Sequence, residues 1–186
     1  MLSETELAPD RLRPLSRQEY DRLVELGAFE DERVELLMGA LVEMSPQGTP
    51  HSWAIDVLGE RLVQRVVPRA RVRVQLPFAA SEVSEPEPDI AVVPRRSYAQ
   101  EHPSEAFLIV EVTVSSSVKD RRVKAPIYAR AGVPEYWVLD PIEHVLEVYT
   151  EPGPEGYERV QKLRAGDQLA LQSFPDVTIR LDEVFQ

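Results

Sequence analysis

Two carboxylates lie within or beside short apolar segments that are typical of buried strands. Glu111 interrupts the run Phe107 to Val114, and Asp89 directly precedes the run Ile90 to Val93. A carboxylate in a buried strand is costly unless something compensates its charge. On neighbouring strands the two side chains can point at one spot, and neither strand supplies a positive partner. Hard oxygen ligands of this kind suit Mg²⁺, Mn²⁺ or Ca²⁺.

Each of these acids also has a purely structural interpretation, which the sequence leaves open. Aspartate is common in turns, so Asp89 could cap the loop before its strand. Glutamate is rarely buried without a partner, so Glu111 could form an internal ion pair with an arginine.

A polar face follows Glu111. Asp120, Lys124 and Tyr128 are spaced i, i+4, i+8, which aligns them on a helix. Lysine is a compact ammonium whose pKa can fall when it is buried, so Lys124 could orient or deprotonate a water molecule. The alternative is an Asp120–Lys124 surface ion pair. Pro126 predicts a kink or a break in the helix.

The elements that position these residues form an α/β pattern. After an arm over 1–15, Ser16 to Glu19 is a capping box that begins an amphipathic helix ending before Gly27. Residues 32–45 predict a β-hairpin around Met38-Gly39, in which the faces of Glu35 and Glu43 cannot be assigned. Thr49 as cap and Pro50 predict a helix that ends before Pro68. Strand, helix and strand over 107–141 form a βαβ-sized unit, and further strands are expected at 70–76, 144–150, 157–163 and 177–181.

Composition limits the classes of function. The 186 residues suit one domain, and 43% hydrophobic with 28% charged residues is ordinary for a globular protein. No apolar stretch is long enough to span a membrane and the first residues do not resemble a signal peptide, so we expect a cytoplasmic protein. There is no cysteine, which excludes thiolate chemistry. Asparagine is also absent and arginine far outnumbers lysine. This usage indicates a thermophile, although a GC-rich genome would give a similar one.

The net charge of -11 excludes a general nucleic-acid coat protein, which would be basic. An enzyme that meets DNA through a local patch and metal ions remains possible. The basic-rich stretch either contacts the DNA backbone or forms ion pairs on a solvated face; it consists of Arg61, Arg65, Arg69, Arg71 and Arg73. The three histidines are too scattered for a histidine metal site. His51, next to a helix N-terminus and the Glu35 hairpin, could border the active site, but we interpret it as an exposed residue.

The order and spacing of these motifs resemble one family. The matching residues are Pro88-Asp89, Glu111-Val112, Ser115-Ser116-Ser117, Asp120, Lys124, Tyr128 and Gly132-Val133-Pro134-Glu135-Tyr136-Trp137. They are similar to the Uma-type restriction endonuclease family, which belongs to the PD-(D/E)XK nuclease superfamily. The likeness reaches back to Glu35 and forward to Phe185.

The resemblance implies a single domain over 1–186 with a restriction-endonuclease-like α/β core. A central mixed β-sheet would be flanked by helices, with an N-terminal helix and β-hairpin and a β-rich C-terminal part. It implies hydrolysis of DNA phosphodiester bonds with Mg²⁺ or Mn²⁺. By position, Asp89 and Glu111 would bind the metal, and Glu35 would be the acid that precedes them in the site and a third ligand.

Two positions depart from the family pattern. The superfamily lysine normally stands two residues after the glutamate, where this chain has Thr113, and Lys124 is the nearest substitute. Ala40 replaces the acid that relatives often carry after the hairpin glycine. The expected catalytic residues are therefore Asp89, Glu111, Lys124 and Glu35.

We also expect a homodimer, because cutting both strands of a duplex favours two active sites. The alternative function is a catalytically inactive nuclease-fold module that acts in protein interaction or self-association, which the acidic charge and Thr113 favour. Metal-assisted hydrolysis of a substrate other than DNA is a third, weaker hypothesis. Convergence of Asp89, Glu111 and Lys124 within a few ångströms would favour the nuclease over the inactive module.

Overall fold

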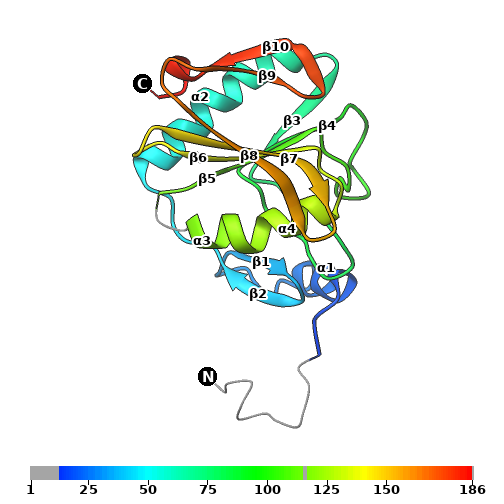
Figure 1. Cartoon of the computed structure of the whole chain (residues 1–186). Helices are drawn as coiled ribbons and strands as arrows, with labels where there is room; N and C mark the ends of the chain where they lie inside the picture. The colour runs from blue at the N-terminus through cyan, green and yellow to red at the C-terminus, as the bar shows by residue number, and fades with distance from the viewer. Residues whose placement is uncertain (1–12, 115–116, 186) are drawn as a thin grey trace.

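A mixed six-stranded sheet forms the centre of the molecule (Figure 1). The computed structural model describes residues 13–114 and 117–185, so Ser115, Ser116 and most of the predicted arm lie outside the described residues. In order across the sheet, the strands are β3 (Ala70–Val74), β4 (Ile90–Pro94), β5 (Leu108–Val112), β6 (Glu135–Asp140), β7 (Val145–Gly153) and β8 (Gly156–Arg164). β5 and β6 run parallel and every other neighbouring pair is antiparallel. This confirms the expected central mixed sheet.

Helices cover both faces of the sheet (Figure 1). α2 (Thr49–Val66) packs on one face, together with the hairpin of β9 (Gln168–Leu171) and β10 (Phe174–Arg180) and the short helix η2 (Leu181–Glu183). On the other face lies the segment of α3 (Ser117–Lys119), η1 (Asp120–Lys124) and α4 (Ala125–Arg130). Successive residues of β4 pack into the hydrophobic cores on opposite faces of the sheet: Val92 packs on the side of α2 and Ala91 on the side of α4. Burial on both faces explains why β4 and β5 are continuous apolar runs.

The N-terminal helix α1 (Arg17–Glu25) has the predicted capping box. The backbone N–H of Glu19 donates to Ser16 Oγ at 3.3 Å, and the backbone N–H of Ser16 donates to Glu19 Oε2 at 2.9 Å. After the helix, Gly27 has a φ of +75°, which favours glycine. In contrast, Thr49 does not cap α2: it is already helical, and the N-cap is Gly48.

The predicted hairpin consists of β1 (Val34–Leu37) and β2 (Ala40–Glu43), and it lies beside the α3 to α4 segment (Figure 1). Its turn residues Met38 and Gly39 both have positive φ, as a two-residue hairpin turn requires. In the register, Glu35 is opposite Val42 and Glu43 is opposite Val34. Glu35 and Glu43 therefore point to opposite faces, with Glu35 fully buried and Glu43 exposed.

Pro126 lies in the first turn of α4, and the helical segment before it is irregular. The segment widens into a π-helix over Asp120–Lys124, where the N–H of Ala125 donates to the carbonyl of Asp120 five residues earlier. This turn accommodates the proline, which has no N–H to donate. It buries both Asp120 and Lys124. A single π turn within an α-helix is frequent at functional sites.

The chain after β6 is rich in strands, as expected, because β7 to β10 follow one another in antiparallel pairs. Within 13–114 and 117–185, no helix has the length and apolar character needed to cross a membrane.

Candidate active site

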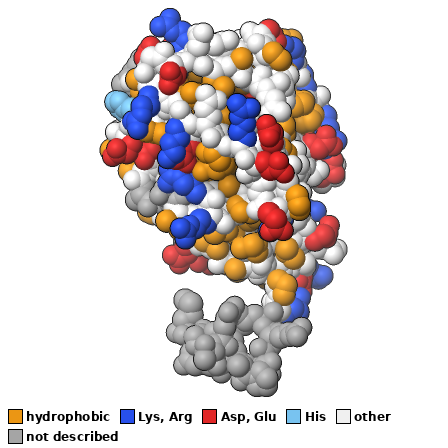
Figure 2. All heavy atoms as spheres, viewed as in Figure 1, with side chains coloured by type: hydrophobic (Ala, Val, Ile, Leu, Met, Phe, Trp, Pro, Cys, Tyr) orange, Lys and Arg blue, Asp and Glu red, His pale blue; other side chains and the backbone are white. Residues whose placement is uncertain are grey.

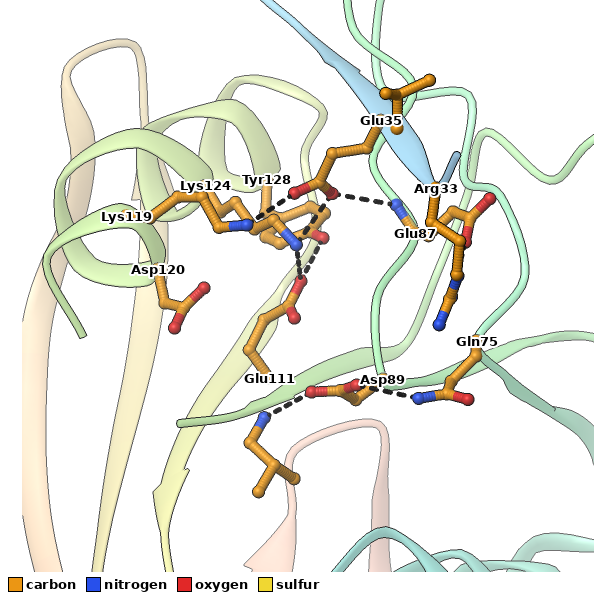
Figure 3. A network of polar contacts seen from close by, with 12 residues as sticks. Arg33, Glu35, Gln75, Glu87, Asp89, Glu111, Lys119, Asp120, Lys124 and Tyr128 are labelled. Carbon is orange, nitrogen blue, oxygen red and sulfur yellow. Dashed lines mark hydrogen bonds and ion pairs between the residues drawn. The ribbon is translucent and has the colours of Figure 1, made fainter. Parts of the chain in front are cut away.

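Asp89 and Glu111 come together at the end of β4 and β5. Ile90 is opposite Val110 in this antiparallel pair, so the next residues outward are Asp89 and Glu111. Asp89 Oδ2 accepts a hydrogen bond of 2.8 Å from the backbone N–H of Val112, which fixes the carboxylate against β5. Both side chains are buried, and both line a cavity of about 190 Å³. The sheet register alone therefore brings the two predicted carboxylates to one place (Figure 3).

Lys124 reaches this place from the neighbouring helix. Its ammonium donates to Glu111 Oε1 at 2.9 Å and lies 2.9 Å from Glu35 Oε2. The residue is only 2% exposed, so the interpretation as an Asp120–Lys124 surface pair is wrong. The charge that compensates Glu111 is thus a lysine from a different element, where an arginine was the expected alternative (Figure 3).

The expected fall in the pKa of Lys124 is also wrong. Burial lowers the pKa of an ammonium, but the facing carboxylates of Glu111 and Glu35 outweigh it, and the pKa of Lys124 is raised. Lys124 is consequently a cation at neutral pH. In this arrangement it can hold carboxylates and offer positive charge, but it cannot accept a proton from water.

Glu35 is held by two lysines. Its Oε1 accepts from Lys119 Nζ at 3.0 Å, and its Oε2 lies 2.9 Å from Lys124 Nζ. A backbone N–H, that of Glu87, donates to the same Oε2 at 3.3 Å. Burial favours the neutral acid, but Lys124 and Lys119 hold the pKa of Glu35 below its usual value. Glu35 is therefore an ionised carboxylate that anchors Lys124.

The pKa of Glu111 is shifted in the opposite direction to that of Glu35. Burial raises its pKa to about 8; the charge of Lys124 opposes this rise, and the carboxylates of Asp89 and Asp120 add to it. The phenol of Tyr128 donates to Glu111 Oε1 at 2.7 Å, the same oxygen that Lys124 contacts. Burial raises the pKa of Asp120 as well, and its side chain lines the same cavity. Glu111 thus favours its protonated form at neutral pH unless additional positive charge is present, and the pKa of Asp120 is shifted in the same direction.

Two further residues surround Asp89. His51, in the first turn of α2, places Nε2 at 3.2 Å from Asp89 Oδ2, and its side chain is 15% exposed. Gln75 donates from Nε2 to Asp89 Oδ1 at 3.4 Å, and its backbone N–H donates to the Asp89 carbonyl at 3.1 Å. The interpretation of His51 as an exposed residue is wrong, because packing turns it into the cavity.

The donor chemistry of the cavity fits a small divalent cation. Mg²⁺ is usually held by one or two carboxylates and keeps several waters, and Asp89 and Glu111 supply such a pair. Glu35 fits less well, since both of its oxygens contact ammonium groups. Among the described residues, no group of three or more His, Asp or Glu side chains is arranged to hold a metal.

Three arginines of the basic-rich stretch form ion pairs within the protein. Arg61 and Arg65 both contact Glu183, at 3.6 and 2.8 Å, and Arg69 contacts Asp176 at 2.8 Å. These pairs tie α2 and its following turn to the C-terminal elements. For these three arginines the ion-pair interpretation is the one that the structure supports.

Sequence reasoning did not select Lys119 for the site, and it favoured an exposed His51 over one that borders the site. Lys119 carried a usable signal, because the chain has only three lysines and two of them lie five residues apart, directly before the π-helical turn and at its last position. His51 carried little signal, since a histidine in a first helical turn has no required direction. Its role follows from the way α2 docks against the end of β4.

Comparison with known proteins assigns the chain to a family and shows a similar fold. The model of the Uma2 family, described as "Putative restriction endonuclease", matches residues 17–182. The chain belongs to the Uma2 family. A solved structure of "a putative nuclease belonging to DUF820" from Anabaena variabilis ATCC 29413 is similar, with a TM-score of 0.75 and 19% identity over 92% of this chain and 98% of that one. At this identity the likeness shows the fold. A search of the curated proteins gives no match.

Proposed function

We propose that this Uma2 protein is a Mg²⁺-dependent endonuclease that hydrolyses DNA phosphodiester bonds. The observation that carries the proposal is the convergence of Asp89, Glu111 and Lys124 in one cavity, although the usual lysine position holds Thr113. Convergence of these three side chains favours a nuclease over an inactive module of the same fold. Membership of a restriction endonuclease family supports the same conclusion.

In this proposal, Asp89 and Glu111 hold the metal ion. A bound divalent ion lowers the pKa of a water molecule and stabilises negative charge on the phosphate. The Val112 N–H and His51 fix the orientation of Asp89. Glu111 is kept on the cavity side by Tyr128 and Lys124.

Lys124 has an electrostatic and positioning role. Its ammonium places a permanent positive charge beside Glu111, where the oxygens of a phosphodiester would lie. Glu35 and Lys119 form the support that fixes Lys124 in the cavity. A charge held in place before the substrate binds stabilises the transition state without reorganisation of the site.

The approach of DNA to an acidic protein requires a local basic surface. Figure 2 shows basic side chains gathered on the left half of one face, with acidic side chains among them. Binding through such a surface would weaken steeply with added salt.

The direct test is cleavage of supercoiled plasmid with Mg²⁺ or Mn²⁺, compared with EDTA. Wild-type protein is expected to nick or linearise the plasmid. Asp89→Asn and Glu111→Gln should abolish this, while Glu43→Gln, on the exposed face of the hairpin, should cleave normally. Intact plasmid with wild-type protein and both metals would leave the inactive interaction module as the better hypothesis. Cleavage that survives Glu111→Gln would place the chemistry elsewhere.

A further inference from the structure

A second pocket adjoins the candidate active site. It has a volume of about 280 Å³ and is lined mainly by Trp53 on α2, by Pro141 and His144 of the β6–β7 turn, and by Phe185. Pro50 lines both this pocket and the cavity of Asp89 and Glu111. In Figure 1 the cyan start of α2 and the yellow β6–β7 turn lie at the same side of the sheet. We call it the aromatic pocket.

The walls of the aromatic pocket are flat rings that remain partly open to solvent. Trp53 is 50% exposed, which is unusual for a tryptophan that packs within a domain. His144 stacks on Phe185 with ring centroids 5.3 Å apart and an angle of 15°. Such a pair forms a preassembled wall of the pocket, and the indole of Trp53 lines the same pocket.

The aromatic pocket lacks the acidic side chains that are common in this protein. The chain has 32 Asp and Glu residues, yet none of them is among the described residues that line the aromatic pocket. The pocket beside the metal site therefore suits a neutral, planar group and offers nothing to bind a cation. A nucleobase has this chemistry, and bases stack on aromatic side chains whatever their sequence.

We propose that the aromatic pocket holds one unpaired nucleobase beside the phosphate that is cleaved, so that single-stranded or locally unpaired DNA is the preferred substrate. The proposal rests on the nuclease function proposed above. A duplex keeps its bases inside the stack, and its binding depends on contacts of Lys and Arg with phosphates. This acidic chain has few basic residues to spare, because several arginines are already paired with acids. Stacking supplies affinity that does not depend on net charge.

The intrinsic fluorescence of the protein provides a specific test. The chain has two tryptophans, and Trp137 is only 1% exposed, so quenching by a bound base reports on Trp53. Glu111→Gln protein, which is not expected to cleave, is titrated in Mg²⁺ with an oligothymidine. The same oligomer with abasic positions and a duplex of equal length serve as comparison. We expect quenching by the single strand, and binding at least about tenfold weaker for the other two ligands.

Variants locate the contact. Anisotropy of a labelled single strand should show Trp53→Ala binding about 5- to 150-fold more weakly, as for the loss of one stacked base. Trp53→Phe retains a ring and should lose much less. Val63→Ala removes an exposed apolar side chain elsewhere on α2 and should bind normally. With active protein, Trp53→Ala should raise KM for the single strand more than it lowers kcat.

The outcomes separate this proposal from the nuclease function. Equal binding of normal, abasic and duplex ligands, without quenching, overturns the base pocket even if plasmid cleavage is observed. Equal quenching by duplex and single strand overturns the substrate preference. Base-dependent quenching of the wild type, together with weaker binding of Trp53→Ala but not of Val63→Ala by anisotropy, supports the pocket even if wild-type protein cleaves nothing.

Discussion

Replacement of Lys124 by methionine tests the central electrostatic argument. Lys124 is 2% exposed and lies 2.9 Å from both Glu35 and Glu111. Methionine retains most of the volume but leaves two buried carboxylates without this cation. Removal of one partner from a buried ion pair typically costs about 3–5 kcal/mol of unfolding free energy. For a chain of this length, that corresponds to a fall in Tm of roughly 6–20 °C.

The loss of unfolding free energy in Lys124→Met should depend on whether Glu111 is protonated. Without Lys124, Glu111 can avoid a buried charge only by binding a proton, so the variant should lose less stability at pH 5 than at pH 8. Lys124→Met combined with Glu111→Gln should recover a large part of the loss at pH 8. Glu35 should contribute less to the loss, because Lys119 still contacts its Oε1.

The assay is urea unfolding at both pH values, with Lys162→Met as the matched control. Lys162 also contacts a carboxylate, Glu147, at 2.7 Å, but its side chain is 66% exposed. Glu147 itself is buried but keeps its contact with Arg121 at 2.6 Å, so this variant should be nearly as stable as wild type. If Lys124→Met costs no more than Lys162→Met, or if Glu111→Gln does not relieve the loss, the reasoning about the buried charge network is wrong.

Further predictions concern catalysis, metal binding, pH and assembly. Lys124→Arg should lower plasmid cleavage by roughly 10²–10³-fold, as for the loss of one preorganised electrostatic group, while the circular dichroism spectrum is unchanged, because a guanidinium does not fit between the two carboxylates; full activity would contradict this. Mg²⁺ at about 100 times its Kd should stabilise wild type by about 2.7 kcal/mol, seen as a rise in Tm that Asp89→Asn abolishes; an equal rise in both would exclude this site. Burial raises the folded-state pKa of Glu111 to about 8 and that of Glu85 to about 7. In the unfolded chain both carboxyl groups have lower pKa values, so between pH 5 and pH 8 the folded state binds more protons than the unfolded state. Stability should therefore fall from pH 5 to pH 8, and Glu111→Gln should reduce the slope of urea melts against pH; a rise over this range would contradict the assignment. Finally, sedimentation at micromolar concentration should give the mass of a homodimer, and a monomer would count against two cooperating active sites.

The amino-acid sequence determined the local structure and the two main acids. The capping box of Ser16 and Glu19, the hairpin turn at Met38-Gly39 and the buried strands around Asp89 and Glu111 all depend on interactions between near neighbours. Such interactions leave a periodic or positional signature that can be recognised without a structure. The order of these motifs was also sufficient to indicate the family.

Tertiary structure alone decided which side chains complete the site. The faces of Glu35 and Glu43 depended on the hairpin register, and a shift of one residue would have exchanged them. The inward turn of His51 depended on the docking of α2 against β4. Neither feature produces a pattern in the surrounding sequence.

Lys124 illustrates the physical reason most clearly. The sequence placed it on a helix face with Asp120, and that spacing equally suited a surface ion pair. The π-helical turn ahead of Pro126 and the packing of α4 on the sheet buried it between Glu35 and Glu111, which are far apart in the chain. Burial then set its charge state, because the field of two facing carboxylates exceeds the cost of desolvation and raises its pKa. A pKa is a property of the assembled environment, so the sequence could identify the lysine but not the sign of its shift.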